Sequence, residues 1–480
     1  MTDEVPASHS DALTGLTLVE AVDAMRCGEI TAEAMTTACL QRIERYDGRL
    51  NATIWIEAGP ALEAAAEADR RRRAGAGLGP LHGLPMANKD MFYQAGRPCT
   101  CGSRILRDFR PDITATVIER LEMAGAITLG GLNMAEFAHN PTGHNAFGDC
   151  HNPWKPDYVT GGSSSGSGAA VAARFVSASL GSDTGGSIRM PASACGVTGL
   201  KPTQTRVSRY GAMPLSFSCD NLGPLARTAR DCARVLHVIA GADAKDPTSA
   251  HEPVPDYEAM LDADLRGCRI GVPRGFLLEG VDPAVQQAFD TSLEVLRGRG
   301  ATVFSVALPV MDEVTAYSAV VSRAEGSATH MRWARDHPGD YAPHVSGRIY
   351  PGFAVPAVYY IEALRRRGPV LRVFAREVFG QVDVIATPTL PGQIPTLAET
   401  DIDTGDADAL RRYSRLGSNV RWVSYLGLPA ISVPCGFDGN GMPIGLQLVG
   451  RPFAEGRLLK TADALQSDTD WHRRAPVLHG

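Results

Sequence analysis

Several features that mark membrane, secreted or nucleic-acid-binding proteins are missing from this 480-residue chain. No apolar run approaches the roughly 18 residues that a membrane span needs. Acidic residues outnumber basic ones by 53 to 47, so no excess of positive charge favours nucleic acid or anionic lipid. The first residues, MTDEVPASHSD, are acidic and polar, unlike a signal or transit peptide. We therefore expect a cytoplasmic location and no nucleic-acid or membrane partner.

Cysteine is too thinly spread for a disulfide framework, with ten residues in 480. The potential metal ligands are a lone CxC at 99–101 and four side chains in a stretch of turn-forming residues: His139, His144, Cys150 and His151. Their spacing matches no familiar structural zinc pattern. We therefore predict a structural loop here, and we expect neither a metal ion nor a cofactor.

Lysine is scarce, because only five of the 47 basic residues are lysines and the other 42 are arginines. The five are Lys89, Lys155, Lys201, Lys245 and Lys460. This chain uses arginine for most of its positive charges, so a lysine can mark a position that needs a property that arginine lacks. The obvious property is the ability to lose a proton. Codon bias and chance explain most of the five, and the remainder are candidate bases.

What the sequence does contain is typical of a globular protein, with 44% hydrophobic and 21% charged residues. Short β-rich runs closed by glycine or proline alternate with helical patterns. This alternation predicts an α/β fold with a mixed, mostly buried central β-sheet flanked by helices on both faces. No linker divides the chain, so we expect one domain over residues 1–480. Within it we expect N-terminal helices over 10–75, a core that carries the chemistry over 76–240 and a helical segment over 315–380.

The helical segment 315–380 is rich in aromatic residues. Six of them lie within 28 residues, whereas aromatics make up 6% of the chain: Trp333, Tyr341, Tyr350, Phe353, Tyr359 and Tyr360. A helical cap that lines an apolar substrate pocket would carry such a cluster. Ordinary packing between helices would carry one too. The first interpretation favours substrates with aryl or bulky apolar groups.

Two neighbouring loops of small residues, GGSSSGSG at 161–168 and GSDTGGS at 181–187, bring backbone N–H groups close to a ligand. A phosphate-binding loop is disfavoured because Ser167 stands where that motif requires lysine. A nucleophile elbow centred on Ser164 is disfavoured because the preceding NPWKPDYVT is a poor buried strand. The third interpretation is a serine nucleophile with a buried neutral lysine as its base.

Three segments carry a resemblance to a known family: GPLHGLPMANKD, TGGSSSGSGAAVAA and GSDTGGSIRMPASACGVTGLKPT. Together they resemble the amidase signature family of serine hydrolases. The resemblance covers nearly the whole chain, from LVEAVDAMRCGEIT near the start to LPAISVPCGFDGNGMPIGLQLVG near the end. It implies the amidase signature fold and an enzyme that cleaves a carbon–nitrogen bond through an acyl-enzyme.

The resemblance also implies a catalytic triad. Ser187 would be the nucleophile, Ser163 the bridging serine after a cis peptide bond, and Lys89 the base. Backbone N–H groups of four residues would hold the oxyanion: Thr184, Gly185, Gly186 and Ser187.

Supporting residues follow from the same resemblance. Gly162 would precede the cis bond, and Asp183 and Arg189 would brace the nucleophile loop as an ion pair. Asp90 and Ser164 would supply hydrogen bonds around the triad.

The sequence departs from the family pattern in places. Ser165 replaces the first glycine of the usual GGSSGGS run, and Leu132 stands where threonine is common. The family's tRNA-dependent glutamine amidotransferase subunits carry a carboxylate before the LPAIS strand, and RYSRLGSNVRWVSYLG offers no clear counterpart. We therefore expect a free-standing amidase for a small amide, anilide or carbamate. The alternative is an amidotransferase subunit that supplies ammonia to a partner, and a homodimer stays open.

Overall fold

The structure is a computed structural model that describes residues 9–275 and 277–478. Its strands are β1 (Thr53–Ile56), β2 (Pro85–Lys89), β3 (Ile127–Leu132), β4 (Ala178–Ser182), β5 (Thr198–Lys201), β6 (Leu222–Ala226), β7 (Arg269–Pro273), β8 (Thr302–Val306), β9 (Val384–Pro388), β10 (Ala430–Phe437) and β11 (Pro443–Gly450). Residues 1–8, on which the expected location rested in part, lie outside the described residues.

Helices connect these strands. The α-helices are α1 (His9–Gly15), α2 (Leu18–Cys27), α3 (Ala32–Leu50), α4 (Ala58–Arg73), α5 (Thr116–Met123), α6 (Ser165–Ala172), α7 (Arg189–Cys195), α8 (Ala229–Ile239), α9 (Pro283–Gly298), α10 (Met311–Asp336), α11 (Pro343–Ile349), α12 (Ala357–Glu377), α13 (Ala407–Arg415), α14 (Arg421–Tyr425) and α15 (Glu455–Ser467). Short 3₁₀ turns are η1 (Arg104–Leu106), η2 (Glu136–Ala138), η3 (Tyr350–Ala354), η4 (Ala398–Thr400), η5 (Ile402–Thr404) and η6 (Trp471–Arg473). In the described part of the chain, no helix is both long and apolar enough to cross a membrane.

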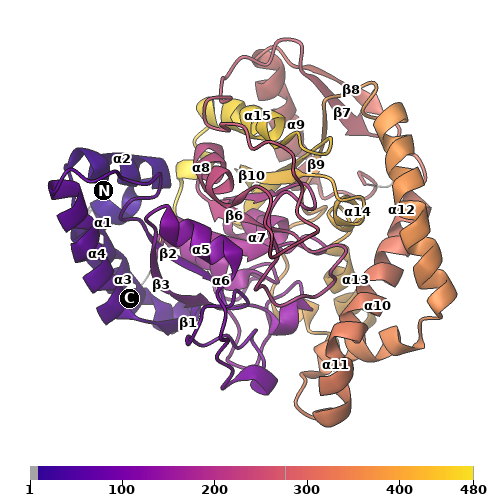
Figure 1. Ribbon diagram of the computed structural model, residues 1–480. Coiled ribbons are helices and arrows are strands. Elements are labelled where there is room, and N and C mark those ends of the chain that lie inside the picture. Colours follow the sequence, from indigo (N-terminus) through magenta and orange to yellow (C-terminus); the bar gives the residue numbers. More distant parts are fainter. Residues whose placement is uncertain (1–8, 276, 479–480) are drawn as a thin grey trace.

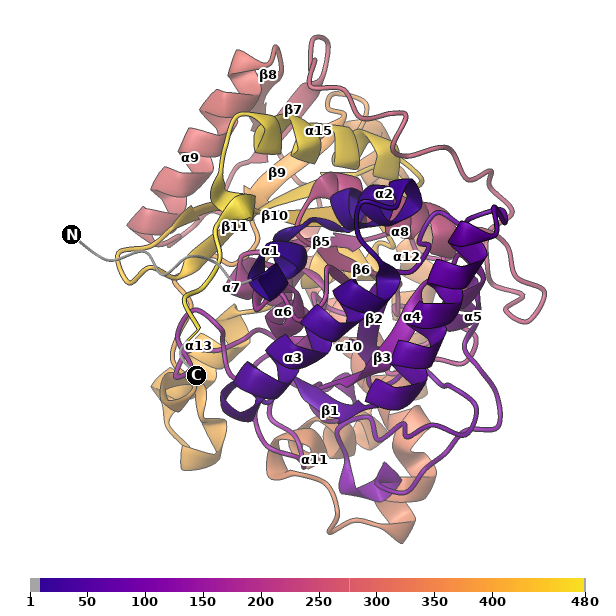
Figure 2. The same ribbon diagram turned by 90° about the vertical axis from the view of Figure 1, so that its left-hand side faces the viewer.

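The large sheet has the strand order β4-β6-β5-β10-β11-β9-β7-β8 and is mixed, because β7 pairs in parallel with β8 and β9 while the remaining pairs are antiparallel. Its central strands are buried along their whole length, apart from the last residue of β10. Helices α6 and α7 lie on one face, and α8, α9 and α15 lie on the other (Figures 1 and 2). The predicted α/β fold with a mixed, buried sheet between helices is confirmed.

A separate three-stranded sheet of order β1-β3-β2 lies beside the N-terminal helices (Figure 2). β2 and β3 run parallel, with Lys89 opposite Leu132 at the ends of the two strands. The sequence patterns predicted one mixed sheet and did not predict this second one, since a short apolar run does not specify its pairing partner. The small sheet matters for function because its strand β2 ends on the candidate base.

The helical segment predicted over 315–380 is present as α10, α11, η3 and α12 (Figure 1). Its six aromatic residues differ in their exposure. Tyr350, Phe353 and Tyr359 are 40%, 44% and 63% exposed, and Trp333 stacks on Phe137 with ring centroids 5.4 Å apart. The interpretation of this cluster as the lining of an apolar substrate pocket stays a prediction. Helix packing accounts for the inner rings, and the outer ones face solvent.

Candidate active site

Lys89 lies at the end of β2 and is 1% exposed. Its Nζ donates hydrogen bonds to Ser163 Oγ at 2.7 Å and to Ser182 Oγ at 2.8 Å. Two of the three triad residues predicted from the resemblance are thus in direct contact. Ser182, the last residue of β4, is a second partner that the sequence reasoning did not single out, although it stands in the quoted GSDTGGS run.

Burial lowers the pKa of Lys89 to about 7, because an ammonium group away from water loses its hydration. The negative charge of Asp220 opposes this shift in part. The amine form of Lys89 is therefore well populated near neutral pH, and in that form it can accept a proton from the Ser163 hydroxyl.

Ser163 stands at a tight turn that enters helix α6. The peptide bond between Gly162 and Ser163 is cis, as the resemblance implies. A Cβ on residue 162 would collide with the backbone carbonyl oxygen of Asn140, so only glycine fits here. Ser163 is fully buried, and its carbonyl oxygen accepts a hydrogen bond from the Ala135 N–H at 3.1 Å. Local packing thus fixes the position of the hydroxyl beside Lys89.

Ser187 ends the loop 183–187 that follows β4, two residues before α7. It is 8% exposed, which is more than either Lys89 or Ser163. Among the described residues, the hydrogen-bond chain from Lys89 reaches Ser163 and does not extend to Ser187. The structure therefore joins the base to the bridging serine and leaves the candidate nucleophile as the most accessible of the three.

Asp183 and Arg189 form the predicted brace, and both side chains are fully buried. Arg189 donates to the two carboxylate oxygens of Asp183 at 2.9 and 2.8 Å. Burial alone would raise the pKa of Asp183, but the Arg189 charge and hydrogen bonds lower it to about 2. Arg189 also donates to Gln447 at 2.6 Å and to Ser424 at 3.0 Å. The nucleophile loop is thereby tied to β11 and α14.

Of the four N–H groups predicted to hold the oxyanion, that of Gly186 already has a partner within the protein. Its N–H donates to Asp183 Oδ1 at 2.7 Å, so this group is already used within the loop. The hydrogen bonds found in the described residues leave the N–H groups of Thr184, Gly185 and Ser187 without a protein acceptor. The Thr184 hydroxyl donates to Asp220, which also accepts the Leu215 N–H at 2.9 Å. The sequence alone could not show that the Asp183 carboxylate turns back and accepts the Gly186 N–H.

Ser164 and Asp90 differ in how they support the site. Ser164 Oγ accepts the Ser182 N–H and donates to the Ser182 carbonyl, both at 3.3 Å, and so positions the second partner of Lys89. Asp90 instead accepts hydrogen bonds from the Thr100 N–H at 2.9 Å and from Trp55 Nε1 at 3.2 Å. Burial raises the pKa of Asp90 to about 6. Asp90 braces the chain just after Lys89 and does not itself contact the triad.

The other lysines separate into surface residues and one buried residue. Lys245 pairs with Glu119 at 2.7 Å, Lys460 contacts Asp262 at 3.4 Å, and Lys155 lies over a tyrosine ring. Lys201 is fully buried, with Nζ donating to the Pro202 carbonyl at 2.8 Å, and burial lowers its pKa to about 7. Two of the five lysines, Lys89 and Lys201, are therefore buried with a lowered pKa. Of these two, only Lys89 contacts Ser163 and Ser182.

Cavities lie beside the catalytic core. One of about 260 Å³ reaches Ser182 and Asp220, and the rest of its lining mixes apolar side chains such as Met213 with charged ones such as Arg209. A larger one of about 790 Å³ lies between α13 and the loop 390–396 and contains no triad residue. The first is the cavity in direct contact with the groups around Lys89.

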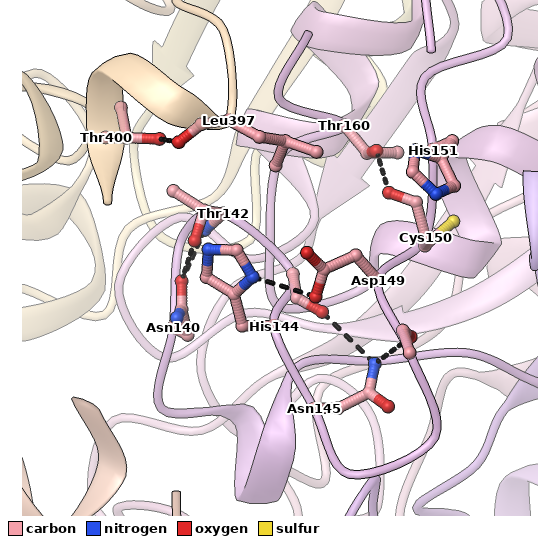
Figure 3. A network of polar contacts seen from close by, with 12 residues as sticks. Asn140, Thr142, His144, Asn145, Asp149, Cys150, His151, Thr160, Leu397 and Thr400 are labelled. Atoms are coloured by element: carbon pink, nitrogen blue, oxygen red, sulfur yellow. Dashed lines mark hydrogen bonds and ion pairs between the residues drawn. The ribbon is translucent and has the colours of Figure 1, made fainter. Parts of the chain in front are cut away.

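The histidine- and cysteine-containing stretch 139–151 is a structural loop, as predicted (Figure 3). His144 contacts Asp149 at 2.8 Å, and His151 Nδ1 lies 2.9 Å from the Pro156 carbonyl oxygen. The Cys150 carbonyl accepts the Thr160 hydroxyl at 2.5 Å. Among the described residues, no group of three or more His, Cys, Asp or Glu side chains is arranged to hold a metal ion.

Comparison with known proteins assigns this architecture to a family. The model of the Amidase family matches residues 34–459. The chain belongs to the amidase family. It is 44% identical to a glutamyl-tRNA(Gln) amidotransferase subunit from Chloroflexus aggregans, over 96% of this chain and 98% of the relative.

Solved structures share the same fold. A chain from a vestigial protein complex linked to the origins of an s-triazine catabolic enzyme is 34% identical, with a TM-score of 0.87 over 94% of this chain and 98% of that one. The native peptide amidase from Stenotrophomonas maltophilia is 32% identical, with a TM-score of 0.81 over 97% of this chain and 99% of that one.

Proposed function

We propose that this amidase family member cleaves the carbon–nitrogen bond of a small amide through a covalent acyl-enzyme on Ser187. The observation that carries the proposal is the contact of a fully buried lysine of lowered pKa with Ser163, directly beside the nucleophile loop. A serine hydroxyl is a weak nucleophile and needs such a base. The brace between Asp183 and Arg189 holds that loop in place.

The reaction follows from these positions. Lys89 takes a proton from Ser163, Ser163 takes one from Ser187, and Ser187 Oγ bonds to the amide carbon. The N–H groups of Thr184, Gly185 and Ser187 are the proposed donors to the oxyanion. The proton returns through Ser163 to the nitrogen as the carbon–nitrogen bond breaks. Water then attacks the ester and frees Ser187, with Ser163 again relaying the proton.

A second candidate function has its own support. The Chloroflexus aggregans relative is an amidotransferase subunit, which favours a chain that supplies ammonia to a partner. Against this, the segment before the LPAIS strand carries Arg421 and no carboxylate in RYSRLGSNVRWVSYLG. Both functions share the first half-reaction, in which Ser187 is acylated and ammonia leaves. They differ in where the ammonia goes.

The purified chain alone tests the proposal. It should hydrolyse members of a panel of small primary amides, anilides, carbamates and esters, with release of ammonia, amine or alcohol, and Ser187→Ala should be inactive on all of them. The expected preference for aryl groups stays a prediction, and the comparison of anilides with aliphatic amides in this panel tests it. Wild-type protein that releases ammonia only in the presence of partner subunits would favour the amidotransferase function instead.

A further inference from the structure

We propose that Asp220 is a positioning residue for the oxyanion site, because it fixes the loop 183–187 through the Thr184 hydroxyl, and that Glu325 of α10 holds the loop that carries Asp220. This inference rests on the proposed function and adds to it two buried carboxylates that the mechanism does not otherwise use. The observations behind it are the strand register at Asp220, the hydrogen bonds of its carboxylate and the contacts of Glu325.

The strand register places Asp220 directly opposite Thr184. The antiparallel pairing of β4 with β6 continues for one residue beyond the two strands. There the Asp183 N–H donates to the Asn221 carbonyl at 2.8 Å, and the Asn221 N–H donates back to the Asp183 carbonyl at 3.2 Å. The next opposed residues in this register are Thr184 and Asp220. Side chains of opposed residues are neighbours, so the contact between these two follows from the pairing of the strands.

The Asp220 carboxylate is 7% exposed and accepts hydrogen bonds from two directions. On its own loop it accepts the Leu215 N–H at 2.9 Å and the Ser216 N–H at 3.0 and 3.1 Å. From the loop 183–187 it accepts the Thr184 hydroxyl. The two N–H groups fix the direction of the carboxylate, so that it is held ready for the Thr184 hydroxyl.

The loop 183–187 needs such a hold because Gly185 and Gly186 lie at its centre. Glycine adopts a wider range of backbone conformations than other residues, and Gly186 has a φ of 118°. Asp183 restrains the second half of the loop by accepting the Gly186 N–H at 2.7 Å. The Thr184 hydroxyl restrains the first half, which supplies two of the three proposed oxyanion donors.

Glu325 on α10 is 1% exposed and anchors the loop 215–220. One of its carboxylate oxygens accepts the Ser216 hydroxyl at 2.6 Å and the Ser218 N–H at 3.0 Å. The other accepts the Tyr360 hydroxyl of α12 at 2.9 Å. A buried carboxylate is costly unless donors surround it, and these three donors come from the loop and from α12. Contacts therefore run from α10 and α12 through this loop to the oxyanion donors.

Loss of this hold should affect the transition state more than the bound substrate. The oxyanion forms only when Ser187 bonds to the carbonyl carbon, so its donors act on kcat more than on KM. A displacement of about 1 Å at such a site can cost about 10²-fold in rate. We therefore expect the Thr184 hydroxyl to contribute to kcat, although it takes no part in the bond changes.

Replacement of Thr184 tests the inference. Thr184→Val removes the hydroxyl and keeps the size of the side chain. It should lower kcat for a small amide by about 10-fold or more, while KM changes by less than about threefold. Thr184→Ser restores the hydroxyl and should recover most of the loss. The matched control is Thr116→Val on α5, which removes a hydroxyl that donates to Asp243 at 2.6 Å and should keep wild-type kcat.

A double-mutant cycle tests whether Thr184 acts through Asp220. The double variant Thr184→Val with Asp220→Ala should have a kcat within about threefold of that of Asp220→Ala alone, because both changes remove the same contact. Asp220→Asn takes its place in the cycle if Asp220→Ala does not fold. Wild-type kcat in Thr184→Val, or losses that multiply in the double variant, would overturn the inference.

Glu325→Gln tests the anchor. It replaces an acceptor oxygen by an amide group that cannot accept, so the loop 215–220 loses part of its hold. It should lower kcat by about threefold or more with a smaller change in KM. Wild-type kcat in this variant would refute the role of Glu325.

The rate at which a fluorophosphonate labels Ser187 keeps this inference separate from the proposed function. Ser187 Oγ bonds to phosphorus as fluoride and the serine proton leave, and the phosphoryl oxygen takes the place of the oxyanion. Labelling needs no amide substrate. Its second-order rate constant should be about 10-fold or more lower in Thr184→Val than in wild type and in Thr116→Val.

Equal labelling rates would refute the role of Asp220 even where amide hydrolysis is confirmed. A wild-type chain that is not labelled at Ser187 would contradict the proposed function, and this inference would fail with it.

Discussion

Lys89 is held between two serine hydroxyl groups, and its pKa of about 7 puts its protonated and neutral forms in balance near neutral pH. Only the neutral amine can accept a proton from Ser163. We therefore predict that kcat/KM for a small amide rises as pH increases through about 7 and levels off above it. The measurement is kcat/KM from pH 5.5 to 9.5, and a profile that falls over this range would exclude Lys89 as the base.

Replacement of Lys89 separates its charge from its ability to lose a proton. Lys89→Arg should be nearly as damaging as Lys89→Ala, because a guanidinium group stays protonated at any working pH. Both should lower amide turnover by orders of magnitude, about 10²-fold or more. Lys245→Arg is the matched control, since Lys245 is a surface residue paired with Glu119. Full activity in Lys89→Arg would refute the mechanism.

Ser163 and Ser187 should respond differently to the loss of the hydroxyl group. Ser163→Ala should lower kcat by about 10²–10⁴-fold, because it removes a proton relay. It should still form the acyl-enzyme slowly. Ser165→Ala, a buried serine two positions along without a hydrogen-bond partner for its hydroxyl in the described residues, is the control and should keep wild-type kcat. Equal loss in the control would mean that any change in this loop is damaging.

Individual residues show what the sequence can and cannot predict. The resemblance to the amidase signature family implied Lys89 and Ser163 as triad members, and Lys89 Nζ lies 2.7 Å from Ser163 Oγ. Ser182 as a second partner of Lys89 and the use of the Gly186 N–H by Asp183 were not predicted. Both depend on side-chain directions that only the folded backbone sets.

At the scale of single elements, Asp183 braces the loop 183–187 from within, and Asp220 holds it from outside through Thr184. Asp183 accepts hydrogen bonds from Arg189 and from the Gly186 and Ile188 N–H groups. Asp183→Asn should destabilise the chain by about 3–5 kcal/mol, since it leaves the buried Arg189 charge without a counter-ion. Urea unfolding checks this. Asp264→Asn, which alters an exposed ion pair with Arg266, should leave the free energy of unfolding nearly unchanged.

The same ion pair predicts how stability depends on pH. The pKa of Asp183 is about 2 in the folded chain, below the ordinary value of 3.8, so its contribution is fully present above about pH 4. That contribution should fade as pH falls from about 4 to 2, as the folded carboxylate becomes protonated. The difference in free energy of unfolding between wild type and Asp183→Asn should therefore shrink over this range. A constant difference would contradict the low pKa.

The composition of the helical segment 315–380 does not predict what its aromatic side chains contact. Its helices were predicted by periodicity, but the aromatic residues along them left two interpretations open, a substrate pocket and ordinary helix packing. Periodicity fixes which residues share a helix face, whereas the neighbour that covers that face is a tertiary property. Tyr359 is 63% exposed because no other part of the described chain covers that face of α12.

At the scale of the whole molecule, two sheets meet at the site. The base lies at the end of a strand in the small sheet, and the loop with Ser187 follows a strand of the large sheet. The sequence predicted the mixed sheet, yet it could not predict which strands pair. Pairing depends on contacts between distant segments, such as that of β5 with β10.

The activity of the isolated chain distinguishes the two candidate functions. We predict that the isolated chain turns over small amides without a partner, because Lys89, Ser163 and Ser187 all come from one chain. Addition of purified amidotransferase partner subunits should leave kcat/KM for a small amide unchanged within a factor of about two. A large increase on their addition would favour the amidotransferase function.

The most direct test of the proposed Ser187 nucleophile is mass spectrometry of the chain after reaction with a fluorophosphonate and, separately, after rapid acid quench during amide turnover. We predict one adduct of the reagent mass and one of the acyl mass, both on the peptide that contains Ser187. Ser187→Ala should carry neither. An acyl adduct on any peptide without Ser187, or turnover by Ser187→Ala, would contradict this assignment.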